Sequence, residues 1–231
     1  MQNRKTTDRR GFLGSIAAGA TMAGIAPVLS PLNLHAEESS SGTAPADDVE
    51  AWFNKIKGKH RIVFDVTHPN EILPFAWPRV FMVTNDKTGT PENQQSVVAV
   101  LRHKAIPYAF EDRLWEKYKL GEEFKIDDPI TKAPSVRNPF WKPKSGDYKI
   151  PGIGNVAIGI NELQDSGVMF CVCDTAITVR SAMIAEKMKL EPEKVKQDWV
   201  AGVLPNIQLV PSGVWALGRA QEHGCGYCFT G

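Results

Sequence analysis

The chain has 231 residues, of which 42% are hydrophobic, and its formal net charge is +1. This length fits one globular domain with a sizeable core once a leader is subtracted. Lysine and arginine are interleaved with aspartate and glutamate, so the charge pattern gives no support for a nucleic-acid partner.

The first 36 residues have the features of a twin-arginine signal peptide. Arg9-Arg10 comes shortly before Phe12-Leu13, a weakly apolar run follows over 14–29, and Ala36 offers a small residue for cleavage. The apolar run is too weak for a membrane span, which needs about 20 strongly apolar residues. We therefore expect a periplasmic or secreted protein with no membrane span after signal removal. The alternative is a basic N-terminal arm.

The next residues alternate between predicted strands and predicted helices. Residues 37–57 form a polar linker with a short helix at 49–56. Strands are predicted at 61–66 and 96–101, because both runs are apolar and rich in β-branched residues. Helices are predicted to begin at Pro78 and at Pro107, since proline suits the first helical turn. The second helix places Ile106, Phe110, Leu114 and Tyr118 on one face.

Residues 119–156 interrupt this alternation. They contain five prolines and several glycines, and we interpret them as a long insertion with a role such as a lid or an interface. Regular elements then resume. The predicted elements are helices at 156–164, 176–188, 192–200 and 214–222, and strands at 167–173, 207–210 and 226–229.

Apolar strands separated by amphipathic helices predict a three-layer α/β/α fold. Its central sheet has about five, mostly parallel, strands, and helices cover both faces. Ligands of such sheets bind beyond the carboxyl ends of the strands. His68, His103 and Cys173 each follow or end a predicted strand. We therefore expect these three side chains on one edge of the sheet.

Cys173 is the first candidate for chemistry. The strand at 167–173 ends on it, and Asp174 or Thr175 is expected to cap the helix that follows. The positive end of a helix dipole favours a thiolate, which is the reactive form of cysteine. The alternative is an inert, buried cysteine.

Two later segments complete a pattern. Val210-Pro211-Ser212-Gly213-Val214 leads into a predicted helix, and the stretch from Gln221 to Tyr227 leads into the last strand. Together with the strand that ends at Cys173, this order resembles the DsrE/DsrF-like family of sulfur-handling proteins. The resemblance is best over 157–228 and looser over 58–118, and it is absent from 119–156. It places a DsrE-like domain at 58–231.

The resemblance implies a sulfur relay that uses a persulfide on Cys173, with no cofactor. His103 would serve as an acid/base group or as a partner of the thiolate, because the family often has a histidine at a comparable strand exit. His68, which follows the first predicted strand, is a further candidate from its place in the sequence. Donor and acceptor thiols or proteins would be the partners, and the chain would form a homo-oligomer. Whether the protein turns over as an enzyme or acts as a carrier is left open.

Two alternatives remain open at this point. Cys225 and Cys228 form a Cys-x-x-Cys pair that the family pattern lacks, and such a pair can form a disulfide or supply metal ligands. Together with Cys171 and Cys173 it could hold zinc or an iron–sulfur cluster, loaded before export. The other alternative is a non-catalytic binding module whose contact surface is the 119–156 insertion.

Overall fold

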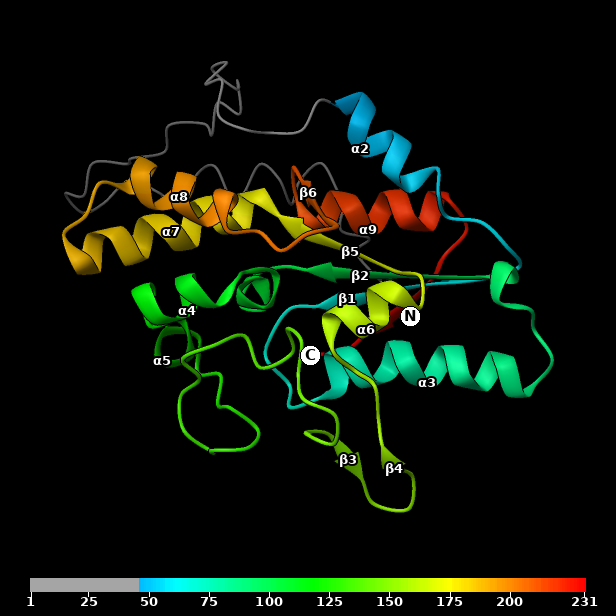
Figure 1. The fold of residues 1–231 in the computed structure, drawn as a ribbon. Coiled ribbons are helices and arrows are strands. Elements are labelled where there is room, and N and C mark those ends of the chain that lie inside the picture. The colour runs from blue at the N-terminus through cyan, green and yellow to red at the C-terminus, as the bar shows by residue number, and fades with distance from the viewer. Residues whose placement is uncertain (1–45) are drawn as a thin grey trace, which may run out of the picture. The chain divides into compact units, whose positions relative to one another are not determined.

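The computed structural model describes residues 46–231 (Figure 1). The predicted signal peptide and residues 37–45 of the predicted linker lie outside this range. The core of the fold is a five-stranded, wholly parallel sheet with the order β6-β5-β2-β1-β7. The strands are β1 (His60–Val66), β2 (Gln95–Leu101), β5 (Val168–Cys173), β6 (Ile207–Val210) and β7 (Gly226–Phe229).

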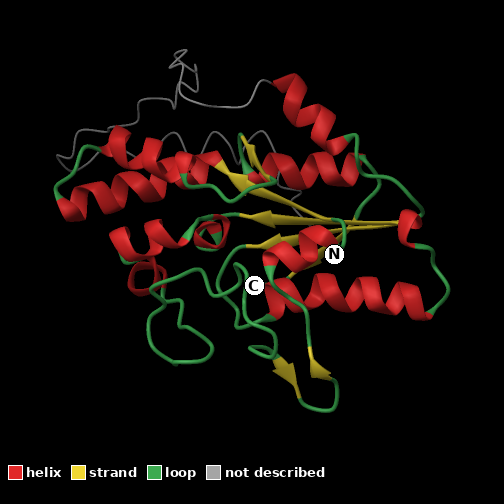
Figure 2. Cartoon of the chain, viewed as in Figure 1, coloured by secondary structure: helices red, strands yellow, loops and turns green. Residues whose placement is uncertain are grey.

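Helices cover both faces of this sheet, which confirms the predicted three-layer α/β/α fold (Figure 2). The α-helices are α2 (Ala46–Phe53), α3 (Leu73–Lys87), α4 (Asp112–Tyr118), α5 (Leu120–Phe124), α6 (Ile160–Asp165), α7 (Asp174–Met188), α8 (Pro192–Ala201) and α9 (Gly213–Glu222). Helices α2 and α9 cover one face of the sheet, and α3 and α6 cover the other. No helix within residues 46–231 is long and apolar enough to cross a membrane.

The side chains of the apolar strands belong to two separate hydrophobic cores, one on each face of the sheet. Successive side chains of a strand point to opposite faces. In β2, Val98 and Val100 therefore pack with α2 and α9, whereas Ala99 and Leu101 pack with α3 and the elements beyond it. All four side chains are completely buried. A strand that is buried on both faces must be apolar throughout, which is why these segments are recognisable in the sequence.

The helix predicted to begin at Pro78 begins five residues earlier. Pro74 lies in the first turn of α3, where its missing N–H costs nothing, and Pro78 lies inside the helix. Pro78 removes one hydrogen bond, to the carbonyl of Pro74, and the helix tolerates this loss close to its start. The sequence prediction used the second proline as the start signal, although the first was the correct one.

The single helix predicted from Pro107 is also wrong, because the chain is broken near Phe110. A 3-10 turn, η2 (Ile106–Ala109), is followed by two extended residues and then by α4. The extended segment pairs with residues 202–204. Leu204 N donates to the Ala109 carbonyl at 2.8 Å, and Glu111 N donates to the Gly202 carbonyl at 3.0 Å. These tertiary hydrogen bonds override the helical periodicity of the apolar residues.

The 119–156 insertion is packed against the domain. It contains α5 and a small hairpin, β3 (Lys149–Ile150) with β4 (Gly154–Asn155). The buried Asn138 amide donates to the carbonyls of Tyr108 at 2.8 Å and Phe110 at 2.9 Å. The helix expected at 156–164 is shorter and begins at Ile160. Gly159 is its N-cap, and the Gly159 N–H donates to the Glu162 carboxylate at 2.8 Å, which fixes the start of the helix.

Candidate functional site

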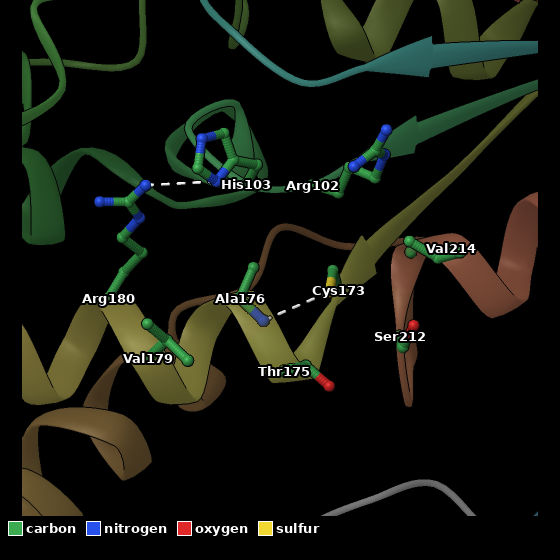
Figure 3. Close-up of a pocket in the computed structure, with 10 residues that line it drawn as sticks. Arg102, His103, Cys173, Thr175, Ala176, Val179, Arg180, Ser212 and Val214 are labelled. Atoms are coloured by element: carbon green, nitrogen blue, oxygen red, sulfur yellow. Dashed lines mark hydrogen bonds between the residues drawn. The ribbon is translucent and has the colours of Figure 1, made fainter. Parts of the chain in front are cut away.

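A pocket of about 250 Å³ lies at the carboxyl edge of the sheet, between the starts of α7 and α9 (Figure 3). It contains two of the three predicted site residues, His103 and Cys173. The lining residues are Arg102, His103, Cys173, Thr175, Ala176, Val179, Arg180, Ser212, Gly213 and Val214. The placement follows from the parallel sheet, since β2 and β5 are neighbours and their carboxyl ends open on the same side.

Cys173 itself caps α7. Its Sγ accepts a hydrogen bond from the Ala176 backbone N–H at 3.2 Å, and the residue is 7% exposed. The predicted caps have other roles: Asp174 is the first helical residue and pairs with Lys196, and the Thr175 hydroxyl donates to the Pro211 carbonyl at 2.8 Å. The thiol therefore lies directly on the positive end of the helix, where an anion is stabilised.

A second helix begins at the same pocket. The Ser212 hydroxyl caps α9 by accepting from the Trp215 N–H at 3.3 Å. Gly213 allows this helix to approach closely, because a Cβ at this position would lie 2.7 Å from the Cβ of Arg102. Two helix N-termini thus flank one small cavity, and both favour a negatively charged occupant.

Arg102 is held in the pocket by a buried carboxylate. Its Nε and Nη2 donate to the two oxygens of Asp65 at 2.6 and 2.8 Å, and the Tyr227 hydroxyl donates to the same carboxylate at 2.8 Å. The hydrogen bond to Asp65 raises the pKa of Arg102 above its usual value, despite the opposing effect of partial burial. The third nitrogen, Nη1, has no partner within residues 46–231 and remains available to a ligand.

His103 contacts both the second arginine of the pocket and the second predicted histidine. The Arg180 guanidinium lies 3.2 Å from His103 Nδ1, and the His68 and His103 rings are 5.0 Å apart in an edge-to-face arrangement. Partial burial and the positive charge of Arg180 lower the pKa of His103. The imidazole is therefore neutral at pH 7, with Nδ1 accepting from Arg180 and the proton on Nε2.

His68 is close to this pocket without lining it. It lies in the loop after β1, and its Nδ1 is 2.6 Å from the Thr67 hydroxyl. Its ring reaches the site only through its contact with His103. The predicted convergence of the three residues on one edge is thus observed, while a catalytic role for any of them stays a prediction.

The Cys-x-x-Cys pair is divided between the two faces of the sheet. Cys225 belongs to the core beneath α2 and α9, whereas Cys228 packs against the opposite core. Both thiols are free, and a disulfide between them would require the strand to rearrange. Burial raises the pKa of Cys225 to about 11, although the charge of Arg61 opposes the shift. This thiol is therefore a poor nucleophile at neutral pH.

The four cysteines do not form a common ligand set for zinc or an iron–sulfur cluster. Strands β5 and β7 are separated by β2 and β1, so about 14 Å of sheet lies between the two cysteine pairs. Cys171 is completely buried among apolar side chains, and this burial raises the pKa of its thiol strongly. Within residues 46–231 no cluster of three or more potential metal ligands is present.

Arg102 and Arg180 are functional candidates that were not predicted from the sequence. Arg102 directly precedes His103 in the loop after β2, so its place at the carboxyl end of a strand was a usable signal. Arg180 lies two turns into α7, and no sequence pattern indicates that its side chain reaches back to His103.

Comparisons with known proteins leave the family undetermined. No family model matches this chain, and no curated protein matches it. Among solved structures, it is similar to a protein of unknown function from Methanobacterium thermoautotrophicum, with 14% sequence identity and a TM-score of 0.38. The match covers 74% of this chain and 98% of that one. Similarity this distant carries no argument about function, so the resemblance to DsrE/DsrF-like proteins stays a prediction.

Proposed function

We propose that this protein accepts and relays sulfane sulfur through Cys173. One observation carries the proposal: the Cys173 thiol caps α7 inside a small pocket that also contains two arginines. A helix N-terminus and nearby guanidinium groups stabilise a thiolate, which is the nucleophile of sulfur exchange.

The proposed step is thiolate exchange with an anionic donor. With hydrogen tetrasulfide as the donor, the Cys173 thiolate attacks the terminal, protonated sulfur. The Sγ–S bond forms, the adjacent S–S bond of the donor breaks, and the proton stays on the transferred sulfur. The products are the Cys173 persulfide and trisulfide dianion, so charge and electrons balance without a further oxidant. An acceptor thiolate removes the sulfur by the same exchange in reverse.

The pocket is suited to the charge that develops in this step. The leaving sulfur chain gains a negative charge, and Arg102 Nη1 is free to contact it. Arg180, which lies 3.2 Å from His103 Nδ1, adds a second positive charge to the pocket. Preorganised donors aimed at developing charge are the usual source of rate enhancement.

Part of the pocket wall is apolar, which suits a sulfur chain that is weakly hydrated compared with an oxyanion. Val179 is 53% exposed and Val214 is 67% exposed, and both line the pocket. These two side chains offer an apolar contact to an approaching thiol donor or acceptor. The homo-oligomer remains part of the proposal on resemblance alone.

The proposal includes export to the periplasm through the twin-arginine route. Its support is the order of Arg9-Arg10, the apolar run and Ala36 in the sequence. Such a protein would handle sulfur outside the cytoplasm, with partners that reach it there.

Mass spectrometry of polysulfide-treated protein tests the proposed acceptor. The reduced protein should gain about 32 Da per sulfur atom on the peptide that contains Cys173. Cys173→Ser should abolish this gain, and Cys228→Ser, which removes the more exposed thiol of the last strand, should leave it unchanged. If Cys173→Ser takes up sulfur as the wild type does, the protein is not a Cys173 carrier, and the binding-module alternative is favoured.

A further inference from the structure

A second cavity, of about 520 Å³, is roughly twice the size of the Cys173 pocket. It lies where the insertion meets the rest of the domain. Its walls come from three places: the loop after β1, the 3-10 turn η2, and residues 125–140 of the insertion. The lining residues are Pro69, Glu71, Ile72, Tyr108, Lys125, Ile126, Asp127, Asp128, Pro129, Lys132 and Phe140.

The wall that the insertion contributes is held in place by its own hydrogen bonds. The Asp128 carboxylate accepts from the N–H groups of Ile130 and Thr131 at 2.8 and 3.1 Å and pairs with Arg137 at 3.0 Å. Ser135 N donates to the Ile126 carbonyl at 2.8 Å. The cavity is thus preformed, as most small-molecule sites are.

Tyr108 provides an unused hydroxyl in this cavity. The residue is only 1% exposed, and no hydrogen bond to its hydroxyl occurs within residues 46–231. The hydroxyl is not one of the fully enclosed unpaired polar atoms of this part of the chain, so it keeps a small contact with the cavity. Burial raises the pKa of Tyr108, so the group remains a protonated donor. Tyr148, the other buried tyrosine nearby, donates to the Pro139 carbonyl at 2.6 Å. A buried polar group normally has a partner, and for Tyr108 a ligand in the cavity would supply it.

The rim of the cavity carries unpaired charges of both signs. Lys125, Lys132, Glu71 and Asp127 all line the cavity, and all four residues are exposed. None of these four side chains has an ion-pair partner in the described part of the chain; Asp128, the fifth charged residue, is committed to Arg137. Ile72, Ile126 and Phe140 contribute apolar surface to the same cavity. Two free cations and two free anions favour a zwitterion over a singly charged ligand.

We propose that this cavity binds a small zwitterion with an apolar body, of the α-amino-acid kind. Its carboxylate lies against Lys125 and Lys132, its ammonium group lies against Glu71 and Asp127, and a polar atom accepts from the Tyr108 hydroxyl. The apolar body packs on Phe140. This site is independent of sulfur transfer at Cys173, and its ligand contacts the loop that directly follows His68.

Calorimetric titration with the complete protein tests this assignment. The probes are l-phenylalanine and l-leucine, compared with 3-phenylpropanoate, which lacks the ammonium group, and 2-phenylethylamine, which lacks the carboxylate. At least one amino acid should bind, and l-phenylalanine or l-leucine should bind at least about tenfold more tightly than either singly charged analogue, because each analogue leaves one charged pair of the rim unused.

Tyr108→Phe should weaken the binding by about fivefold, which corresponds to one hydrogen bond, because it removes the hydroxyl and keeps the packed ring. Tyr148→Phe is the matched control, since that hydroxyl is already paired, and the affinity should not change. Absence of binding by both amino acids, tighter binding of either analogue, or an unchanged affinity in Tyr108→Phe would each overturn the proposal.

Discussion

At the scale of single residues, the distinctive feature is the way Arg102 is held. The buried Asp65 carboxylate accepts hydrogen bonds from Arg102 Nε, Arg102 Nη2 and the Tyr227 hydroxyl. Two of the three guanidinium nitrogens of Arg102 are thereby fixed, and Nη1 is left for the pocket. A fixed guanidinium loses little conformational entropy when it contacts an anion. Asp65 and Tyr227 are thus positioning residues, and Arg102 is the group that contacts the donor in the proposed step.

This arrangement predicts a selective effect of Arg102→Met. The rate of Cys173 persulfidation by anionic tetrasulfide should fall by about tenfold relative to the rate of alkylation by neutral iodoacetamide, because only the first reagent needs the positive charge. Reactions with each reagent are quenched at several times, and the modified Cys173 peptide is quantified by mass spectrometry. The two time courses give the ratio of the persulfidation rate to the alkylation rate. Arg102→Lys should restore only part of this ratio, because an ammonium group keeps the positive charge but cannot hold both Asp65 oxygens and also present a free nitrogen. If the rates with tetrasulfide and with iodoacetamide fall equally, Arg102 affects only the reactivity of the Cys173 thiol or the stability of the fold, and the proposed contact with the anionic donor is wrong.

Part of the site was predictable at this scale and part was not. Cys173 and His103 follow apolar strands, so the rule for parallel sheets placed them at the same edge. The cap was assigned to Asp174 or Thr175 because oxygen side chains are the commonest caps, whereas the structure uses the Cys173 sulfur. The Asp65–Arg102–Tyr227 network joins β1, the β2 loop and β7, and no local pattern predicts contacts between such distant segments.

At the scale of elements, a single carboxylate links α8 to α4. Asp198 accepts from Lys117 Nζ and from the Tyr118 hydroxyl, both at 2.7 Å, and it also pairs with Arg113. Partial burial alone would raise the pKa of Asp198, but these hydrogen bonds outweigh it and lower the pKa to about 2. The pairing contributes stability above pH 4, and this contribution is lost as the pH falls toward 2.

Asp198→Asn should therefore lower the free energy of unfolding at pH 7 by about 1–2 kcal/mol, a value reduced for the partial exposure of the site. The difference from the wild type should shrink between pH 4 and pH 2, where the wild-type carboxylate becomes protonated. Urea unfolding at several pH values measures both effects. A difference that stays constant down to pH 2 would contradict the assigned role of the charge.

The elements also show which sequence signals were reliable. The five strands were predicted nearly to the residue, because burial on both faces requires continuous apolar runs. The helix from Pro107 was wrong, although Ile106, Phe110, Leu114 and Tyr118 are all buried as its periodicity required. The backbone at Phe110 is extended because it pairs with the segment after α8, and periodicity in one segment contains no information about a distant partner.

At the scale of the whole molecule, the export proposal makes a separate prediction. Changing both Arg9 and Arg10 to lysine should leave the uncleaved precursor in the cytoplasm, because the twin-arginine pair is the defining part of the proposed signal. Cell fractionation with an antibody against the domain measures the distribution. Mature protein at the wild-type level in the periplasm would show that residues 1–36 are not a twin-arginine signal.

The central claim is that the fold makes one of four thiols reactive toward sulfane sulfur. The most direct test is the site-resolved rate of persulfidation by tetrasulfide, measured for each cysteine by peptide mass in the folded protein and again in guanidinium chloride. In the folded protein Cys173 should react fastest, because it lines a pocket at a helix N-terminus although it is as little exposed as Cys225. Cys171 should be protected by complete burial, and Cys225 should be slow because its thiol pKa is raised to about 11. In the denatured chain the four rates should converge. Modification confined to Cys225 or Cys228 in the folded protein, with Cys173 untouched, would contradict the account.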